Sequence, residues 1–337
     1  MSLIKEETLI KPPKKAASVM KAATVVMPGL IQLQQIIIPT PAPDEVLIKL
    51  EGCGLCSSNL PPFEGRDWFQ YPLEKGSLGH EGWGVVEKTG YEVENIKTGD
   101  RVSALSYHAF AEYDVAKESD VVKLPPALED KPFPGEPLGC AMNIFERSQI
   151  QEGQTVAVIG AGFLGCLLIQ LAKNKGARVL AISKRKSSLE MARECGADEI
   201  IPFEENEHII QQVKEFTGGD FCDRVIEATG KQQPLELAGE LTAIRGRLII
   251  AGYHQDGLRK VNMQLWNWRG LDVINAHERD PQQYIGGIRK AVQAIEKEEL
   301  NPYPLFTHRF HLENISKAFE ALKNRPEGFI KALIMFN

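Results

Sequence analysis

Hydrophobic and polar residues alternate differently in the two parts of this chain. Before about residue 130, short stretches such as 45–50 alternate polar and apolar positions, and turn residues recur at intervals of roughly eight to twelve residues. This pattern is typical of half-buried β-strands and predicts a compact barrel or sandwich. Further strands are expected at 99–103 and 109–115.

From about residue 150 onward, β-branched runs alternate with stretches of helical spacing, which predicts a parallel, doubly wound sheet. The expected strands are 155–159, 178–182, 224–227, 246–251 and 271–274, and the expected helices are 164–175, 188–195, 207–216 and 233–241. After about residue 281 come two amphipathic helices, 283–297 and 312–324, and a terminal strand. They do not continue the sheet pattern, so they could fold back onto the first domain.

The glycine cluster Gly160-Ala161-Gly162-Phe163-Leu164-Gly165 separates the first of these strands from a helix. Gly160 permits a sharp turn, Gly162 lets a ligand approach the backbone, and Gly165 lets the helix pack against the strand. The free N–H groups at the start of the helix suit a pyrophosphate. Because the spacing has this strand-to-helix context, it indicates a dinucleotide site; the alternative is a turn that is merely tight.

The composition excludes several classes of protein. The chain has 337 residues, 43% hydrophobic residues and a formal net charge of −6, which fits a soluble two-domain protein and offers no basic surface for nucleic acid. No apolar stretch could span a bilayer, and the polar, Lys-rich start lacks the core of a secretory signal. We therefore expect a cytoplasmic protein with a small-molecule ligand. Residues before Ala22 could form a flexible arm or an extra strand.

Six cysteines are scattered along the chain, which argues against a disulfide framework. Cys56 and the pair His80-Glu81 are soft and borderline metal ligands separated by a loop, and could begin a zinc site. Cys53 and Cys56 could alternatively form half of a zinc knuckle, but the chain has no second pair of this kind.

In combination, these motifs resemble the zinc-containing alcohol dehydrogenases of the medium-chain dehydrogenase/reductase superfamily. The resemblance rests on the zinc signature that begins Gly79-His80-Glu81, the loop around Cys56, the strand Gly99-Asp-Arg-Val102 and the glycine cluster, together with the closing Lys331-Ala-Leu-Ile334. It implies an N-terminal GroES-like β-barrel catalytic domain, 1–145 completed by 281–337, and a doubly wound Rossmann domain, 146–280.

The resemblance also implies a zinc site. Cys56 and His80 match the ligands of the family, and Glu81 matches a carboxylate that binds zinc in some members. The third ligand position of the family, counted back from Gly160, falls on Glu136 and not on Cys140, which we expect to be a packing residue. A Glu at this position resembles the polyol and threonine dehydrogenase branch.

Two departures from the family pattern stand out. The cysteine-rich lobe that holds a structural zinc is missing, so we expect one zinc ion per chain. Asn59 stands where the family usually has Asp, and Leu60-Pro61-Pro62 occupies the region of the relay histidine. The hydroxyl of Ser58 is then the group placed to pass on the substrate proton.

The end of the second strand of the dinucleotide domain predicts the coenzyme. Ser183, Lys184 and Arg185 stand where an NAD-specific domain has an acid, and they suit the 2′-phosphate of NADP(H). A solvated basic turn is the alternative. Thr229, Gly252 and Lys331 complete the expected cofactor site.

The implied reaction is reversible hydride transfer between a secondary alcohol and nicotinamide, with zinc as Lewis acid. A zinc-free quinone or enone reductase of the same superfamily, and a non-catalytic NADP(H)-binding protein, remain alternatives. The loop 63–69 and the segment Trp266-Asn267-Trp268 would suit a polyol, sugar or cyclitol, but could equally be surface. His277 could line the cofactor cleft, and the family implies a homodimer or homotetramer.

Overall fold

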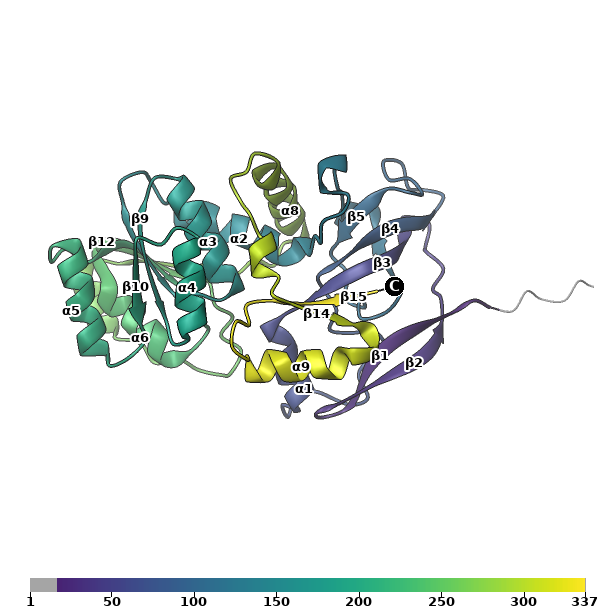
Figure 1. The fold of residues 1–337 in the computed structure, drawn as a ribbon, viewed down its shortest axis with the longest axis horizontal. Coiled ribbons are helices and arrows are strands. Elements are labelled where there is room, and N and C mark those ends of the chain that lie inside the picture. Colours follow the sequence, from purple (N-terminus) through teal and green to yellow (C-terminus); the bar gives the residue numbers. More distant parts are fainter. Residues whose placement is uncertain (1–16, 337) are drawn as a thin grey trace, which may run out of the picture.

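Two β-sheets organise the fold and lie side by side along the long axis of the molecule (Figure 1). The computed structural model describes residues 17–336. One sheet has seven strands, with β14-β15-β3-β4-β5-β7 in order and β6 paired to β3, and the other has six strands. Helices α2 (Gly135–Ser148) and α8 (Pro281–Glu296) pack against each other between the two sheets.

The seven-stranded sheet is built from both ends of the chain. Strand β15 pairs antiparallel with β3, so that Ile334 lies opposite Cys53. A separate hairpin of β1 and β2 lies beside it. The strands are β1 (Val19–Met27), β2 (Leu30–Ile37), β3 (Glu45–Leu55), β4 (Gly82–Thr89), β5 (Arg101–Ala104), β6 (Tyr113–Lys117), β7 (Val121–Lys123), β14 (His308–His311) and β15 (Ala332–Met335), with helices α1 (Leu60–Glu64) and α9 (Ile315–Asn324).

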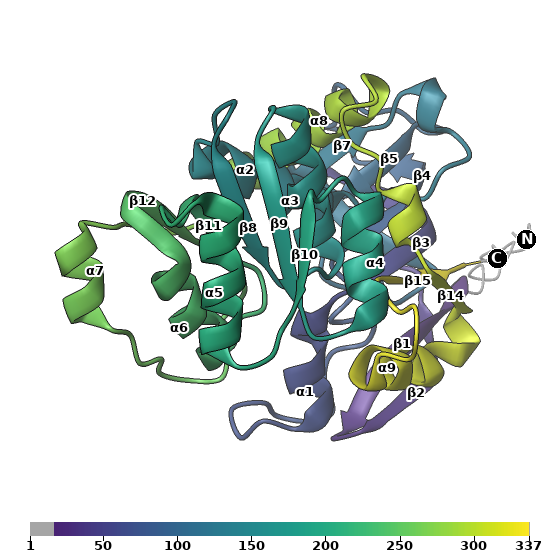
Figure 2. The same ribbon diagram turned by 60° about the vertical axis from the view of Figure 1, so that its left-hand side comes forward.

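The six-stranded sheet is parallel, in the order β10-β9-β8-β11-β12-β13. Figure 2 shows its strands with the helices that connect them. The strands are β8 (Thr155–Ile159), β9 (Arg178–Ser183), β10 (Glu199–Pro202), β11 (Cys222–Glu227), β12 (Thr242–Ile250) and β13 (Asp272–Asn275), and the helices are α3 (Phe163–Asn174), α4 (Lys186–Glu194), α5 (Asn206–Thr217), α6 (Gln232–Leu241) and α7 (Met263–Arg269).

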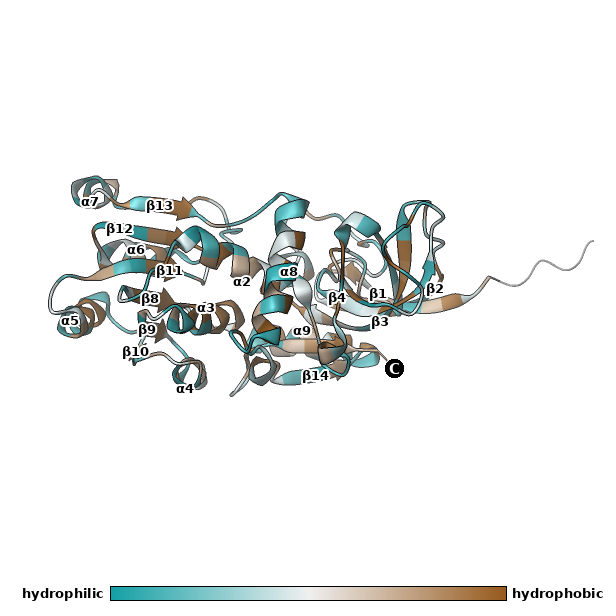
Figure 3. Ribbon diagram, turned by 90° about the horizontal axis from the view of Figure 1, so that it is seen from above, coloured by the Kyte–Doolittle hydropathy of each residue, from teal (hydrophilic) through white to brown (hydrophobic). Residues whose placement is uncertain are grey.

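Both faces of this sheet are buried, which explains its nearly continuous hydrophobic strands (Figure 3). Along β8, Val156 and Val158 pack toward α3 and α4, whereas Ala157 and Ile159 pack toward α5 and α6. The strand order reverses between β8 and β11, and ligands of such sheets bind in the crevice at the carboxyl ends of the strands there. The fold class predicted from the sequence, a GroES-like domain joined to a doubly wound domain, is confirmed.

The expected elements and the observed ones differ in a few places. The five strands and four helices expected between 150 and 275 are present with ends shifted by a few residues, while β10 and α7 were not expected. The strand expected at 109–115 begins only at Tyr113, because the backbone of Ala109 and Phe110 bonds to the loop 76–79 and to β1 instead of to β3. The boundaries 145/146 and 280/281 stay a prediction. Residues 1–16, to which the arm before Ala22 belongs in large part, lie outside the described range, and β1 starts at Val19.

Among the described residues, no helix is both long and apolar enough to cross a membrane.

Candidate active site

A cavity of about 980 Å³ lies between the two sheets, where the parallel strands β8, β9, β11 and β12 end. Every residue that the sequence indicated as a metal ligand, a cofactor contact or the proton-transfer group lies in its wall. These residues are Cys56, Ser58, His80, Glu81, Glu136, Gly160, Gly162, Phe163, Leu164, Gly165, Ser183, Lys184, Arg185, Thr229, Gly252 and Lys331. The folded chain therefore brings the expected metal ligands and the expected cofactor residues to one cavity.

The glycine loop has the geometry that a phosphate-binding turn requires. Gly160 has a φ of +103°, and a Cβ on Gly165 would lie 2.0 Å from the carbonyl oxygen of Gly160. Gly162 is the N-cap of α3, and a Cβ there would meet nothing within 4 Å. The first and third glycines are thus needed for the turn and its packing, while the second leaves room on the cavity side.

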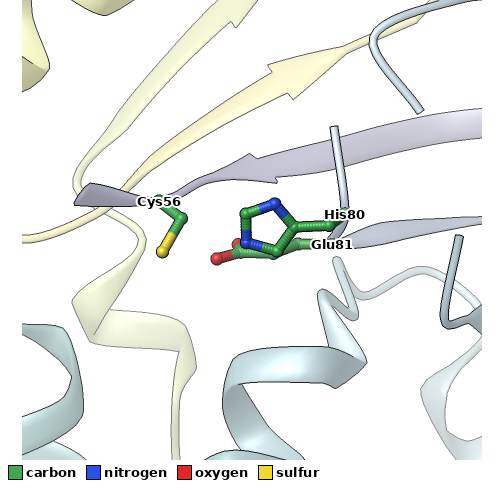
Figure 4. Close-up of side chains that lie close together, drawn as sticks. All are labelled: Cys56, His80 and Glu81. Carbon is green, nitrogen blue, oxygen red and sulfur yellow. The ribbon is translucent and has the colours of Figure 1, made fainter. Parts of the chain in front are cut away.

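The metal-type side chains converge because β3 and β4 pair as antiparallel neighbours. Cys53 lies opposite Gly82 in this pair, so Cys56, just after β3, faces His80 and Glu81, just before β4. One ligand atom from each of the three residues lies within 4.8 Å of the other two. Figure 4 shows the Cys56 sulfur, a ring nitrogen of His80 and the Glu81 carboxylate gathered around one space. A thiolate, an imidazole and a carboxylate are a donor set that zinc accepts.

Glu81 is fully buried, and the Lys331 ammonium lies close to both of its carboxylate oxygens. The Lys331 ammonium lies 2.7 Å from Oε1 with hydrogen-bond geometry, and 2.6 Å from Oε2 without it. Oε2 is thus ion-paired with Lys331 but accepts no hydrogen bond of good geometry. Gly54 makes room for it, since a Cβ there would lie 1.7 Å from Oε2. A carboxylate oxygen that accepts no hydrogen bond and lies beside a thiol and an imidazole has lone pairs with which it can bind a metal ion.

Glu136 lies outside the group of three but faces the same site from the first turn of α2. It accepts a hydrogen bond from Cys140 Sγ at 3.2 Å, and burial raises the pKa of its carboxyl. The pKa of His80 rises to about 10: burial opposes its charge, but the hydrogen bond to Cys56 and the charge of Glu136 outweigh burial. The cluster therefore retains a proton strongly, as a group of anionic ligands does in the absence of a cation.

The three cations that follow β9, Lys184, Arg185 and Lys186, make different contacts. Lys184 Nζ lies 5.5 Å from the centre of the Phe203 ring, and Arg185 Nη1 donates to the carbonyl of Phe329. Lys186, next in sequence, does not line the cavity and lies 3.8 Å from Glu190 on the surface. Lys331 lines the cavity as expected, but its ammonium is engaged by Glu81.

Of the two alternatives for the segment 266–268, substrate contact or surface, the first is wrong for both tryptophans and the second holds for Trp268. Trp266 is buried against Gly239 in the core of the parallel sheet, and Trp268 is 87% exposed, so neither reaches the cavity. Their spacing of two residues on α7 directs them to opposite sides of the helix. In the loop 63–69, Glu64 and Arg66 do line the cavity, and so does His277.

Several residues of the cavity wall carried no signal in the sequence. Tyr107, Asn143, Tyr284 and Arg325 reach it from four different elements or loops. Just behind the wall, the buried Glu227 accepts hydrogen bonds from the Thr229 backbone at 2.7 Å and from His254. Only tertiary structure brings these residues together, so neither spacing nor residue type could have indicated them.

Two family models match the chain. The model described as "Alcohol dehydrogenase GroES-like domain" matches residues 42–126, and the one described as "Zinc-binding dehydrogenase" matches residues 164–293. The first contains Cys56, His80 and Glu81, and the second contains most of the parallel sheet. Both halves of the fold are thus matched independently.

Known proteins resemble the chain over nearly its whole length. A sorbitol dehydrogenase of Halalkalibacterium halodurans is 25% identical, covering 85% of this chain and 90% of that protein. An L-threonine 3-dehydrogenase of Pyrococcus abyssi is 28% identical, covering 88% and 93%. The structure of 2R,3R-butanediol dehydrogenase from Bacillus subtilis superposes with a TM-score of 0.82 at 24% identity, covering 94% of this chain and all of that one.

Both family models, the relatives and the fold agree with the resemblance inferred from the motifs. The relatives are dehydrogenases that act on small molecules. The chain therefore belongs to the zinc-type alcohol dehydrogenases of the medium-chain dehydrogenase/reductase superfamily and is an oxidoreductase.

Proposed function

We propose that this protein is a zinc-dependent dehydrogenase that transfers hydride reversibly between a secondary alcohol and NADP(H). The observation that carries the proposal is that Cys56, His80 and Glu81 share one cavity with the Gly160–Gly165 loop. A metal-type cluster and a loop suited to a dinucleotide in one cavity are what hydride transfer from an alcohol at a metal requires.

Cys56, His80 and Glu81 would hold the ion, and Glu136 is the neighbouring carboxylate that could replace Glu81 or a water molecule. Zinc supplies Lewis-acid chemistry when bound: it lowers the pKa of a ligated alcohol and stabilises the alkoxide. His80 is oriented for this role because its Nδ1 donates to the carbonyl of Leu78 at 2.9 Å, which leaves Nε2 for the metal. We expect one ion per chain.

Ser58 is the residue that we assign to proton transfer. It lines the cavity two residues after Cys56 and is half-buried, so its hydroxyl can accept the alcohol proton and pass it to solvent. Phe163, at the start of α3, stacks on Phe306 and lies under the Lys331 ammonium, and closes the apolar part of the wall. The chain thus orients the reacting groups, while the coenzyme carries the redox chemistry.

The choice of NADP(H) over NAD(H) rests on Ser183, Lys184 and Arg185. All three line the cavity at the end of β9, and no carboxylate stands there to bind an unmodified ribose. Among similar structures, one from Sinorhizobium meliloti holds NADP and one from Escherichia coli holds NADH, each at 24% identity, so the likeness to them does not choose the coenzyme.

For the substrate we propose a polyol, sugar or cyclitol. Arg66, Tyr107, Asn143, Glu278 and Tyr284 give the cavity wall polar groups that hydroxyls can bind. Relatives named for sorbitol, butanediol and threonine all act on molecules with a hydroxyl beside a polar group. We further expect a homodimer or homotetramer, which light scattering of the purified protein tests.

Metal analysis with a dehydrogenase screen tests the zinc role. We expect about one zinc per chain and alcohol-dependent reduction of NADP⁺, both lost in Cys56→Ser and His80→Ala while NADPH still binds. Full activity after exhaustive chelation would contradict the zinc role. Reduction of quinones or enones by a metal-free protein would establish the zinc-free reductase instead, and coenzyme binding without turnover of any substrate would establish a binding protein.

Coenzyme titrations test the NADP(H) preference. Lys184→Ala and Arg185→Ala should weaken NADPH binding and leave NADH binding nearly unchanged, because only NADPH carries the 2′-phosphate. Lys186→Ala is the matched control, since it removes a neighbouring cation that does not line the cavity. A clear preference of the wild type for NADH, with both variants unaffected, would refute this part of the proposal.

A further inference from the structure

Arg325 occupies a backbone position that normally favours glycine. It is the C-cap of α9, with a φ of +45° and a ψ of +66°, and its backbone N–H donates to the carbonyl of Ala321. Glycine adopts this left-handed conformation without steric cost, whereas a side chain with a Cβ is strained in it. A large side chain at such a position calls for a reason beyond ending the helix.

The side chain of Arg325 extends into the cavity. Its Nη2 donates to Ser57 Oγ at 2.9 Å, and Ser57 is the neighbour of the metal-type residue Cys56. The residue is more than a third exposed to solvent, because it lines an open cleft. Among the described residues, this bond to a hydroxyl is the one side-chain hydrogen bond of Arg325, and it uses one of the five guanidinium donors.

The charge of Arg325 is not balanced by a carboxylate. Within residues 17–336, no Asp or Glu forms an ion pair with Arg325 or with Arg185, whereas Lys331 is paired with Glu81 and Lys231 with Asp256. Arg325 and Arg185 lie close enough to interact: burial lowers the pKa of Arg185, and the charge of Arg325 lowers it further. The two guanidinium groups thus lie near each other, and the nearby carboxylate of Glu327 acts on Arg185 without forming an ion pair with it.

The position of Arg325 along the cleft indicates which anion would bind. Ser183 to Arg185 line the cleft where β9 ends, whereas Cys56 and His80 line it where β3 ends and β4 begins. A dinucleotide with its 2′ position at the first end and its nicotinamide at the second has its diphosphate in between, at the Gly160–Gly165 loop. Arg325 bonds to Ser57, the neighbour of Cys56, shares the cleft with the glycine loop and lies near Arg185 after β9, so we place it in this middle stretch.

The loop and Arg325 come from different domains. The loop belongs to the parallel sheet, while α9 packs with β14 and β15 of the other sheet and lies beneath them in Figure 1. An anion bound by both would be held from both sides of the cleft.

We propose that Arg325 binds the diphosphate of the dinucleotide from the catalytic-domain side, opposite the Gly160–Gly165 loop. The proposal rests on the proposed function only in that the ligand is a dinucleotide, and it holds for either coenzyme. A planar guanidinium suits two phosphate oxygens at once, and the bond to Ser57 holds it in the required orientation.

The variant Arg325→Gly tests this, because glycine accepts the φ of +45° and only the side chain is lost. Its melting temperature should equal or exceed that of the wild type. We expect the Kd of NADPH and of NADH, measured by fluorescence titration without substrate, to rise together by about 10- to 100-fold, the effect of losing a charge-assisted contact. Arg325→Lys should fall between the two, since lysine keeps the charge but not the bidentate geometry.

Arg245→Gly is the matched control. Arg245 is also an arginine with positive φ (+58°), but it is exposed on β12 and does not line the cavity. This variant removes the same charge and the same backbone strain, and it should leave both Kd values unchanged.

The outcomes separate this proposal from its rivals. Unchanged Kd values in Arg325→Gly would overturn it, as would a loss confined to NADPH, which would place Arg325 at the 2′-phosphate. A loss confined to the KM of phosphorylated alcohols would place it at the substrate and also overturn it. A wild type that prefers NADH refutes only the coenzyme choice, whereas a wild type that binds neither dinucleotide overturns both this proposal and the proposed function.

Discussion

Asn59 and His80 hydrogen-bond to the same backbone oxygen, the carbonyl of Leu78. Asn59 Nδ2 donates to it at 2.8 Å and His80 Nδ1 lies 2.9 Å from it. Leu78 has a φ of +73°, which is unusual for a residue other than glycine. Since a carbonyl only accepts hydrogen bonds, His80 must carry a proton on Nδ1, and its Nε2 is directed to the cluster. The amide of Asn59 also accepts from the backbone of Cys56 at 2.9 Å, so one buried side chain braces both proposed ligands.

This arrangement predicts the effect of Asn59→Asp. The substitution restores the residue that the family usually has, but here it removes the donor to Leu78 and places a carboxylate against a carbonyl. We expect zinc affinity to fall by about 10- to 100-fold, as when other partners of metal ligands are removed. Competition with a chelator of known affinity measures it.

The control for this variant is Asn143→Asp. Asn143 is also a buried amide that donates to a backbone carbonyl, that of Gln283 at 2.9 Å, but it lies outside the ligand cluster. Its zinc affinity should match the wild type. If Asn59→Asp binds zinc as tightly as this control does, the bracing role of Asn59 is wrong.

A second prediction concerns the pH dependence of zinc binding. The pKa of His80 is about 10 in the metal-free cluster: burial opposes its charge, but Cys56 and the carboxylates outweigh burial. Below that pH, zinc must displace the His80 proton, so affinity should rise with pH by about tenfold per unit for each proton released. Titration of the metal-free protein between pH 6.5 and about 9, in buffers of different ionisation enthalpy, counts these protons. A zinc affinity that does not change over this range would contradict the prediction.

A third prediction concerns the buried pair of Lys331 and Glu81. Burial favours the neutral amine, but the charges of Glu81 and Cys56 raise the pKa of Lys331 above its usual value of 10.5. The stabilisation is therefore complete at pH 7 and is lost only as pH rises through the raised pKa. Lys331→Met leaves Glu81 buried without a partner and should cost about 3–5 kcal/mol in the unfolding free energy of the metal-free protein.

Zinc should reduce that cost, because a cation beside Glu81 replaces the lost ammonium. Urea unfolding with zinc and with chelator measures the difference, and Lys331→Arg, which keeps the charge, is the control. An equal cost in both states would show that Glu81 does not face the metal.

The elements that the sequence predicted well are those whose hydrophobic pattern is long or whose turn chemistry is local. Strand β8, the glycine loop and the start of α3 lie within twenty residues, and each constrains the next. Strand β10 was not predicted because it has four residues and only one of them, Ile201, is buried. An edge strand this short shows no alternation of apolar and polar residues from which it could be predicted.

The residues of the candidate site also fall into two groups: those in local sequence motifs and those that only long-range contacts bring to the site. Cys56, His80 and Glu81 come from loops on neighbouring strands, and their motifs are local. Lys331 was expected at the cofactor, yet its ammonium binds Glu81, which is 250 residues away in sequence. That contact exists because β15 pairs with β3, and nothing in either segment alone indicates the register. Arg325 ends α9, which packs against β14 and β15, so its position in the cleft also depends on long-range packing.

The last prediction uses Gly162 to test the dinucleotide site without disturbing the fold. A Cβ at Gly162 meets no atom within 4 Å, and its φ of −87° suits alanine, so Gly162→Ala should leave the melting temperature unchanged. The added methyl group points into space that the cavity leaves for a phosphate, and it would displace the phosphate from the N–H groups of α3. We expect the Kd of NADPH to rise by about tenfold or more, which corresponds to losing one charge-assisted hydrogen bond.

Gly286→Ala on α8, equally free of close neighbours, should instead stabilise the protein by about 0.5–1 kcal/mol and bind NADPH normally. If Gly162→Ala binds NADPH as well as Gly286→Ala does, the coenzyme diphosphate does not lie on this loop.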